Sequence, residues 1–246
     1  MHTIDDKLAK VTERIQQAAL AAGRNPETVH LIAVSKTQSA AAVAQAYTCG
    51  QRRFGENYLQ EALEKQAALE AMTEHSFRDI EWHFIGPIQS NKTRTISENF
   101  AWVHSIDREK IAQRLNDQRP VELPPMQVCL QVNIDDEATK SGISLAELPL
   151  LAQIVNQLPH LQLRGVMCIP AAANSPAQQR ATFSKLRKAL AQLQANGLVG
   201  LDTLSMGMSG DLEAAIAEGA TLVRVGTDIF GVRASSENKM YLDKAE

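Results

Sequence analysis

The sequence has few cysteines, and their spacing excludes two kinds of structural framework. Only three cysteines occur among 246 residues. No CxxC pair and no mixed Cys/His ligand spacing is present. Neither a disulfide scaffold nor a zinc site is therefore indicated, and a reducing compartment, the cytoplasm, fits this composition best.

Long apolar runs and an excess of charge of one sign are also missing. No apolar run approaches the ~20 residues that cross a bilayer, and the start of the chain lacks the cationic flank and apolar stretch of a signal peptide. The formal net charge of −3 gives no field that would gather nucleic acid or an anionic membrane surface. We expect neither as a partner, so any anion site must be local.

The sequence does contain a regular alternation of short apolar runs and stretches of helical period, with no linker or low-complexity segment between its halves. Apolar residues from Ile4 to about Ala22 recur at three- and four-residue steps, and Gly23 follows, which predicts a preliminary helix. Eight strands, each followed by a helix, are then expected at residues 30–36, 51–56, 81–86, 101–106, 126–133, 161–169, 201–206 and 221–226.

The strand count predicts one α/β domain spanning residues 1–246, a single (β/α)8 TIM barrel with an additional N-terminal helix. The length of 246 residues agrees with the roughly 250 typical of this fold. An open doubly wound sheet is the rival architecture. It usually needs fewer strands, and no GxGxxG motif follows the first strand here.

Lys36 stands at the end of the first expected strand. Period-two alternation places it on the same face as Ile32 and Val34, opposite Ala33 and Ser35. The chemistry of a barrel sits at the C-terminal ends of its strands, where a partly desolvated lysine has a lowered pKa and can condense with an aldehyde. The alternative is a solvated lysine in the loop after the strand.

Two loops near the end of the chain have the form of phosphate-binding loops. After the seventh expected strand, Ser209 can cap the next helix and offer its hydroxyl, while Gly210 permits close backbone approach. After the eighth, Gly226 and Thr227 can offer consecutive N–H groups and a hydroxyl. Each motif alone is a common turn, but barrels often bind phosphate at these two loops. Together they predict a phosphorylated aldehyde beside Lys36.

Arg224 shares a face of the eighth expected strand with Leu222 and Gly226, while Val223 and Val225 face the helices. An arginine that faces the barrel interior needs a partner. One interpretation is an ion pair with an internal carboxylate. The other is a hydrogen bond to the ring nitrogen of a cofactor. A protonated arginine would leave that nitrogen unprotonated and weaken the ring as an electron sink.

With these residues in place, the chain resembles the pyridoxal 5'-phosphate homeostasis protein family over nearly its whole length. That family's fold is similar to the N-terminal barrel of alanine racemase, the fold-type III class of pyridoxal-phosphate proteins. The motifs that carry the resemblance are AVSKTQ around Lys36, FGENYLQE around Asn57, WHFIGPIQSNK around His83, LRGVMCI, LSMGMSGDLEAAIAEGAT and VRVGTDIFG.

The resemblance implies that pyridoxal 5'-phosphate is held as a covalent aldimine on Lys36 and that Arg224 faces the pyridine nitrogen. It also implies a cytoplasmic, monomeric protein that keeps this cofactor in check and affects amino-acid and keto-acid balance. Apo forms of pyridoxal-phosphate enzymes are possible recipients. The residues that would hold the phosphate are Ser209, Gly210, Gly226 and Thr227.

Other residues of these motifs have weaker assignments. Asn57 follows the second strand and is expected either to hydrogen-bond near the aldimine or to cap the next helix. Met206 would pad the cofactor ring or serve as a core methionine. His83 lies on a strand, where a histidine is more often a satisfied core residue than a catalyst. Four polar loop residues are expected on a solvated surface unless they have such a role: Gln89, Asn91, Lys92 and Lys140.

Two main functions stay open. One is a non-enzymatic binder that stores or delivers pyridoxal phosphate, and the other is a pyridoxal-phosphate-dependent amino-acid racemase; a barrel without cofactor is a third. In the racemases that the barrel resembles, the second acid/base is a tyrosine from a separate C-terminal domain. Here the chain ends soon after the eighth strand, and no tyrosine is placed to replace it. Proton transfer on both faces needs a second base, so we expect binding without catalysis.

Overall fold

The computed structural model describes residues 3–72, 76–136, 141–171 and 175–231. Eight strands alternate with helices along the chain. The strands are β1 His30–Val34, β2 Arg53–Glu56, β3 Glu81–Phe84, β4 Trp102–Ile106, β5 Met126–Gln131, β6 Leu161–Met167, β7 Thr203–Ser205 and β8 Leu222–Val225. The helices are α1 Ile4–Ala21, α2 Ala40–Thr48, α3 Leu59–Glu70, α4 Thr93–Asn99, α5 Glu109–Gln118, α6 Leu148–Asn156, α7 Pro176–Ala195, α8 Leu212–Ala217 and α9 Thr227–Phe230, with 3₁₀ turns at Pro26–Thr28 and Ser90–Lys92.

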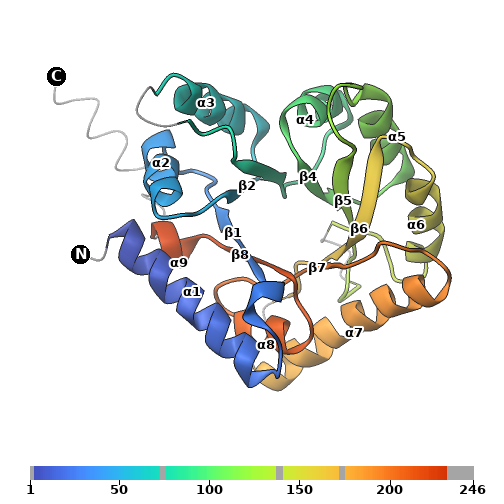
Figure 1. Cartoon of the computed structure of the whole chain (residues 1–246). Coiled ribbons are helices and arrows are strands. Elements are labelled where there is room, and N and C mark those ends of the chain that lie inside the picture. Colours follow the sequence, from blue (N-terminus) through green and yellow to red (C-terminus); the bar gives the residue numbers. More distant parts are fainter. Residues whose placement is uncertain (1–2, 73–75, 137–140, 172–174, 232–246) are drawn as a thin grey trace.

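The strands form a closed parallel barrel. Each strand pairs with the next along the chain, and β8 pairs with β1 through a register that sets Ile32 beside Arg224. Figure 1 shows the helices arranged around the outside of this ring. The predicted (β/α)8 barrel with its N-terminal helix is thus confirmed, and each strand falls within its expected range. That residues 1–246 make one domain stays a prediction, because residues 232–246 lie outside the described part.

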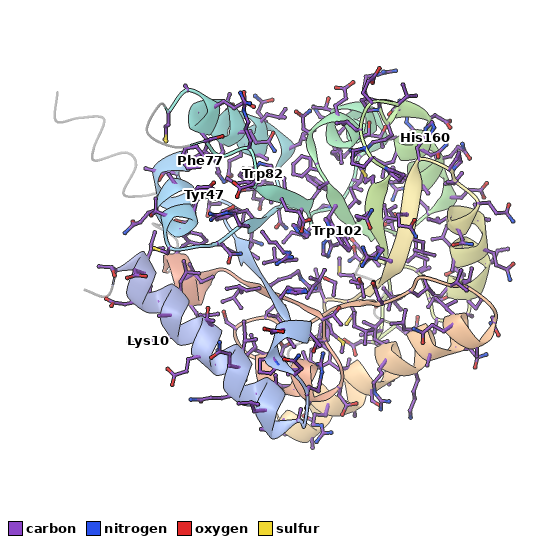
Figure 2. All side chains as sticks on the ribbon, viewed as in Figure 1. Lys10, Tyr47, Phe77, Trp82, Trp102 and His160 are labelled. Atoms are coloured by element: carbon purple, nitrogen blue, oxygen red, sulfur yellow. The ribbon has the colours of Figure 1, made fainter. Side chains whose placement is uncertain are left out.

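Side chains alternate between two layers, as the period of a strand requires. The outer layer lies between strands and helices and contains a large continuous apolar cluster. The barrel interior holds a small apolar cluster of Ile32, Trp102, Cys129, Met167 and Leu222, and Figure 2 shows Trp102 near the centre of the ring of strands. The predicted faces of the first and eighth strands are correct, since Ile32 and Leu222 point inward while Ala33 and Val223 pack outside.

Helix α1 begins and ends where the sequence predicts, and it packs against α8 and α9 (Figure 1). Thr3 and Asp6 form a reciprocal capping box at its start. Gly23, with a φ of 68°, turns the chain away just after it ends. The helix therefore lies beside the loops that follow β7 and β8. Within the described ranges, no helix combines the length and the apolar character that a bilayer span requires.

Candidate cofactor site

Lys36 lies just past β1 at the barrel mouth, a term used here for the C-terminal ends of the eight strands. The prediction that Lys36 is the last strand residue was wrong by two positions, because β1 ends at Val34 and a turn follows. The Ser35 amide still donates to the carbonyl of Gly55 at 3.0 Å, and the Gln38 amide closes the turn on the Ser35 carbonyl at 3.0 Å. Lys36 is half-buried in this turn.

Helix α3 holds the backbone on both sides of Lys36. Thr37 has a φ of 63°, a conformation that β-branched residues rarely adopt. Its amide donates to Glu61 Oε1 at 2.5 Å, and the same oxygen accepts from Lys65 Nζ at 3.0 Å. Lys65 Nζ also donates to the Ser35 carbonyl at 2.8 Å. These bonds fix the position of the turn that carries the lysine.

A buried ionic cluster lies behind this turn, and sequence reasoning missed it. Glu56 Oε1 accepts from Lys65 Nζ at 2.5 Å and from Ser35 Oγ at 2.6 Å, with both charged side chains almost fully buried. Burial raises the pKa of Glu56, and the Lys65 ammonium opposes that rise. The only signal in the sequence is the four-residue spacing of Glu61 and Lys65, which is equally typical of an exposed helix face.

Arg224 faces the barrel interior, as predicted, and is 4% exposed. Its Nη1 donates to Ser205 Oγ at 2.6 Å and its Nη2 donates to the carbonyl of Cys168 at 2.8 Å. Desolvation lowers its pKa. Among the described residues no carboxylate forms an ion pair with it, so the alternative of an internal ion pair is not found. A guanidinium held by two neutral acceptors keeps further N–H donors for a ligand.

The loop after β7 differs from the prediction in its cap. Asp211, not Ser209, is the residue that precedes α8. The Asp211 carboxylate turns back to accept the Met208 amide at 2.6 Å, and the helix cap lies two residues later than expected. Burial raises the pKa of Asp211. A Cβ added to Gly210 would meet nothing within 4 Å, so its backbone faces open space. Met206 is fully buried in the outer apolar layer, which favours its interpretation as a core methionine.

The loop after β8 returns the chain to β1. Gly226 precedes the short helix α9, and a Cβ at this glycine would lie 3.1 Å from the Val34 carbonyl. The close approach brings Gly226 and Thr227 next to the end of β1, two residues from Lys36. Several backbone N–H groups in the two loops have no protein acceptor among the hydrogen bonds of the described residues, and they include those of Ser209, Gly210, Gly226 and Thr227. Such groups suit a bound phosphate.

Arg14 of α1 joins the two loops, a role that sequence reasoning did not find. Its guanidinium donates to both Glu213 carboxylate oxygens and, at 2.8 Å, to the Ser209 carbonyl. It also reaches Asp228 Oδ2 at 3.1 Å. The N-terminal helix therefore ties the loop after β7 to the loop after β8.

Asn57 stands between β2 and α3, and its Oδ1 is buried without a hydrogen-bond partner among the described residues. It does not cap α3, because the cap position belongs to Tyr58 and carries no side-chain cap bond. Gly86 packs so closely that a Cβ there would lie 2.3 Å from the Asn57 carbonyl oxygen. An unsatisfied buried amide oxygen is costly, so a hydrogen-bond donor from a ligand would offset that cost at Asn57.

The remaining residues of the family motifs differ in how exposed their side chains are. His83 is fully buried and hydrogen-bonds to His104 and Glu81, as a satisfied core histidine does. Lys140 lies outside the described residues. Three side chains are exposed, as the surface alternative requires: Gln89, Asn91 and Lys92.

Comparisons with known proteins define the class. The family model described as "Alanine racemase, N-terminal domain" matches residues 7–234. The chain is 60% identical over 233 residues to a pyridoxal phosphate homeostasis protein of Pseudomonas aeruginosa, covering 95% of this chain and 97% of that one. A protein of the same name from Escherichia coli is 52% identical over 233 residues, covering 95% and 98%.

A solved structure gives the same result. PipY from Synechococcus elongatus, with PLP bound, superposes with a TM-score of 0.79 at 38% identity, covering 93% of this chain and all of that one. The fold and the barrel-mouth residues thus define an alanine-racemase-like barrel. The chain belongs, within that class, to the pyridoxal phosphate homeostasis protein family.

Proposed function

We propose that this protein binds pyridoxal 5'-phosphate as a Schiff base on Lys36 and acts in intracellular homeostasis of that cofactor, without catalysis of its own. The observation that carries the proposal is the solved structure of PipY with PLP bound, a relative that this chain matches over 93% of its length. When bound, the cofactor would supply an aldehyde for condensation with an amine and a phosphate for anchoring.

The barrel-mouth geometry supports a distinct role for each group. The Lys36 side chain is half-buried on a turn that α3 holds in place. Four N–H groups of the loops after β7 and β8 would hold the phosphate. Arg224 would donate to the ring nitrogen, and the Asn57 amide would complete its hydrogen bonding near the aldehyde. The residues therefore fit the cofactor.

The biological part of the proposal is a carrier or regulator. Arg224 stays protonated and so would keep the ring a weak electron sink, which suppresses side reactions and by itself slightly favours the racemase alternative. The carrier role is supported instead by the lack of an identified second base for proton transfer on both faces of the cofactor. We expect a cytoplasmic monomer that passes the cofactor to apo-enzymes and thereby affects amino-acid and keto-acid balance. Stopped-flow transfer to an apo-enzyme tests delivery, and a rate no faster than that from free cofactor would contradict it.

Borohydride trapping tests the covalent attachment. The purified protein is incubated with pyridoxal phosphate, its visible absorbance is recorded, and the reduced adduct is located by peptide mapping. We expect a reduced adduct on Lys36 and loss of the absorbance band in Lys36→Ala. Lys92→Ala, which removes an exposed lysine of another family motif, is the matched control and should keep the band.

An adduct on a different lysine would overturn the assignment. Lys140, Lys239 and Lys244 are the residues to inspect. Catalysis is tested separately through deuterium exchange at the α-carbon of alanine and other amino acids. Turnover at ordinary enzyme rates would refute the carrier proposal and favour the racemase alternative.

A further inference from the structure

A row of polar side chains crosses the barrel interior, and beyond Arg224 none of its members has a part in the cofactor site described above. It starts at Arg224, whose Nη1 lies 2.6 Å from Ser205 Oγ. Ser205 Oγ lies 2.8 Å from His104 Nδ1, and His104 Nε2 lies 2.9 Å from His83 Nδ1. His83 Nε2 then lies 3.0 Å from Glu81 Oε1. These five residues, contributed by β3, β4, β7 and β8, are called the polar row below.

With both imidazoles neutral, as the desolvation that lowers the pKa of His83 and of His104 favours, the charged ends of the polar row select one arrangement of protons. Arg224 can only donate, so Ser205 Oγ accepts from it and has its own proton to give to His104 Nδ1. His104 is then protonated at Nε2 and donates to His83 Nδ1. His83 is in turn protonated at Nε2 and donates to a Glu81 carboxylate, which can only accept. With neutral rings, the reversed arrangement would leave the unprotonated Nε2 of His83 facing the Glu81 carboxylate, two acceptors face to face in a buried site.

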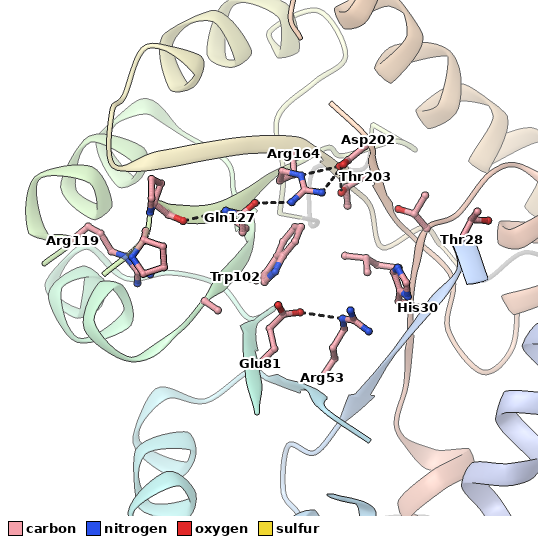
Figure 3. Close-up of a pocket in the computed structure, with 15 residues that line it drawn as sticks. Thr28, His30, Arg53, Glu81, Trp102, Arg119, Gln127, Arg164, Asp202 and Thr203 are labelled. Carbon is pink, nitrogen blue, oxygen red and sulfur yellow. Dashed lines mark hydrogen bonds and ion pairs between the residues drawn. The ribbon is translucent and has the colours of Figure 1, made fainter. Parts of the chain in front are cut away.

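The Glu81 end of the row lies at the barrel floor, the N-terminal ends of the strands and the opposite end from Lys36. A cavity of about 630 Å³ opens there, lined by residues that include Glu81, Arg53, Arg164 and Asp202. Figure 3 shows its two ion pairs, Arg53–Glu81 and Arg164–Asp202. The pKa of Glu81 is lowered to about 2, and the hydrogen bond from His83 is the largest cause. Glu81 is therefore an anion at neutral pH.

We propose that Glu81 is a positioning residue for the cofactor-facing arginine, because its carboxylate fixes the tautomers of His83 and His104 and so holds Ser205 as the acceptor for Arg224. The inference rests on the proposed function for the contact between Arg224 and the ring nitrogen. The barrel floor, at the opposite end from Lys36, would then have a part in cofactor binding. The alternative is that Glu81 serves only the stability of the floor through its ion pair with Arg53.

The first measurement needs no cofactor. Two-bond proton–nitrogen correlation spectra of protein labelled with nitrogen-15 histidine report the tautomer of each ring, assigned by single substitutions. We expect one Nε2–H tautomer for His83 and for His104. In Glu81→Gln an amide can donate as well as accept, so a population of the Nδ1–H form should appear. Arg53→Gln removes the ion pair but leaves the carboxylate, and the tautomers should stay as in the wild type.

The second measurement compares two ligands. Glu81→Gln should weaken binding of pyridoxal phosphate by about three- to tenfold, as coupled neighbours in one network do. A phosphorylated hydroxybenzaldehyde with carbon in place of the ring nitrogen should bind the variant and the wild type alike. Asp202→Asn makes the same carboxylate-to-amide change in the other floor ion pair, which shares no hydrogen bond with the polar row among the described residues, and should leave both affinities unchanged.

The outcomes separate the two proposals. Mixed tautomers in the wild type, unchanged tautomers in Glu81→Gln, or an equal loss of affinity for both ligands would overturn the positioning role. Absence of any pyridoxal phosphate binding by the wild type would instead refute the proposed function, while the spectra without cofactor would still decide whether Glu81 sets the tautomers.

Discussion

The outer layer and the interior of this barrel differ in the kinds of side chain that fill them. The outer layer is a continuous apolar core in which phenylalanine, leucine, isoleucine and valine side chains from strands and helices pack together. Among the described residues, the interior holds a five-residue apolar cluster, and the polar row runs beside it. The interior of a TIM barrel is more often filled by layers of bulky branched residues. The outer layer therefore provides most of the stability, and the interior holds positioned donors and acceptors.

Burial of polar groups has a free-energy cost, and most of the hydrogen bonds at both polar sites are made, although Glu56 Oε2 is buried without a partner among the described residues. A buried polar group is expensive unless its hydrogen bonds are made. In the polar row each side chain supplies the partner that its neighbour needs, and in the Glu56–Lys65 cluster the ammonium bonds to three acceptors. Both networks end next to groups assigned to the cofactor, Arg224 and Lys36. These two networks therefore lie beside the groups that would orient a ligand, while other buried polar side chains, such as Asn116 and Arg119, lie elsewhere in the fold.

Truncation of the outer layer should have the largest effect on stability. Phe183 of α7 is fully buried there, and Phe183→Ala should lower the free energy of unfolding by about 3–5 kcal/mol through lost burial and the resulting cavity. The yield of borohydride-trapped cofactor from folded protein should stay unchanged. Urea unfolding followed by circular dichroism measures the first quantity. A loss below about 1 kcal/mol would contradict the assignment of stability to this layer.

Removal of the buried ammonium should cost nearly as much and should also affect the site. Lys65→Met leaves the Glu56 carboxylate buried without its charge partner, and we expect a loss of about 3–5 kcal/mol in urea unfolding. It also frees the turn around Lys36, so trapping of the cofactor should slow.

The double variant Glu56→Gln/Lys65→Met is the informative partner, since it removes both charges and should recover part of the lost stability. Lys185→Met, at an exposed lysine, is the control and should change stability by less than about 0.5 kcal/mol. A double variant less stable than Lys65→Met would argue against an uncompensated Glu56 charge.

The barrel could be predicted because its signals are local. Eight apolar runs and the stops between them gave all eight strands, and alternation gave the correct faces for Ile32 and Arg224. The errors occurred where a side chain decides the boundary. The Asp211 carboxylate, bonded to the Met208 amide, moved the cap away from Ser209. The turn bonded to α3 ended β1 two residues before Lys36.

The partners of the site residues could not be predicted, because they come from distant parts of the chain. Arg14 meets Ser209 and Asp228 across more than 190 residues, and its helical pattern marks it only as a polar surface residue. His104 meets Ser205 across 101 residues. Strand alternation places a histidine inward, but only the closed barrel sets which side chain faces it.

Acid should weaken the interior before it weakens the outer layer, and this is the smallest effect expected. Desolvation lowers the pKa of His83 and lowers that of His104 well below its usual value, with Arg224 and His83 adding to the effect at His104. A base with a lowered pKa in the folded state binds fewer protons there than in the unfolded chain. Stability is thus complete above the unfolded pKa of about 6.5 and falls as the pH drops below it.

The pH dependence of unfolding isolates this contribution. Each neutral buried histidine should make the free energy of unfolding fall as the pH drops below 6.5, with a slope of at most about 1.4 kcal/mol per pH unit. His104→Asn removes one such group, so its free energy of unfolding, measured in urea, should fall less steeply over that range, whatever its value at pH 7. Between pH 7 and 8 the two proteins should have parallel profiles. Equal slopes below pH 6.5 would mean that His104 is not held neutral. The proposed proton arrangement of the polar row would then be wrong, and the contrast between the interior and the outer layer would not hold.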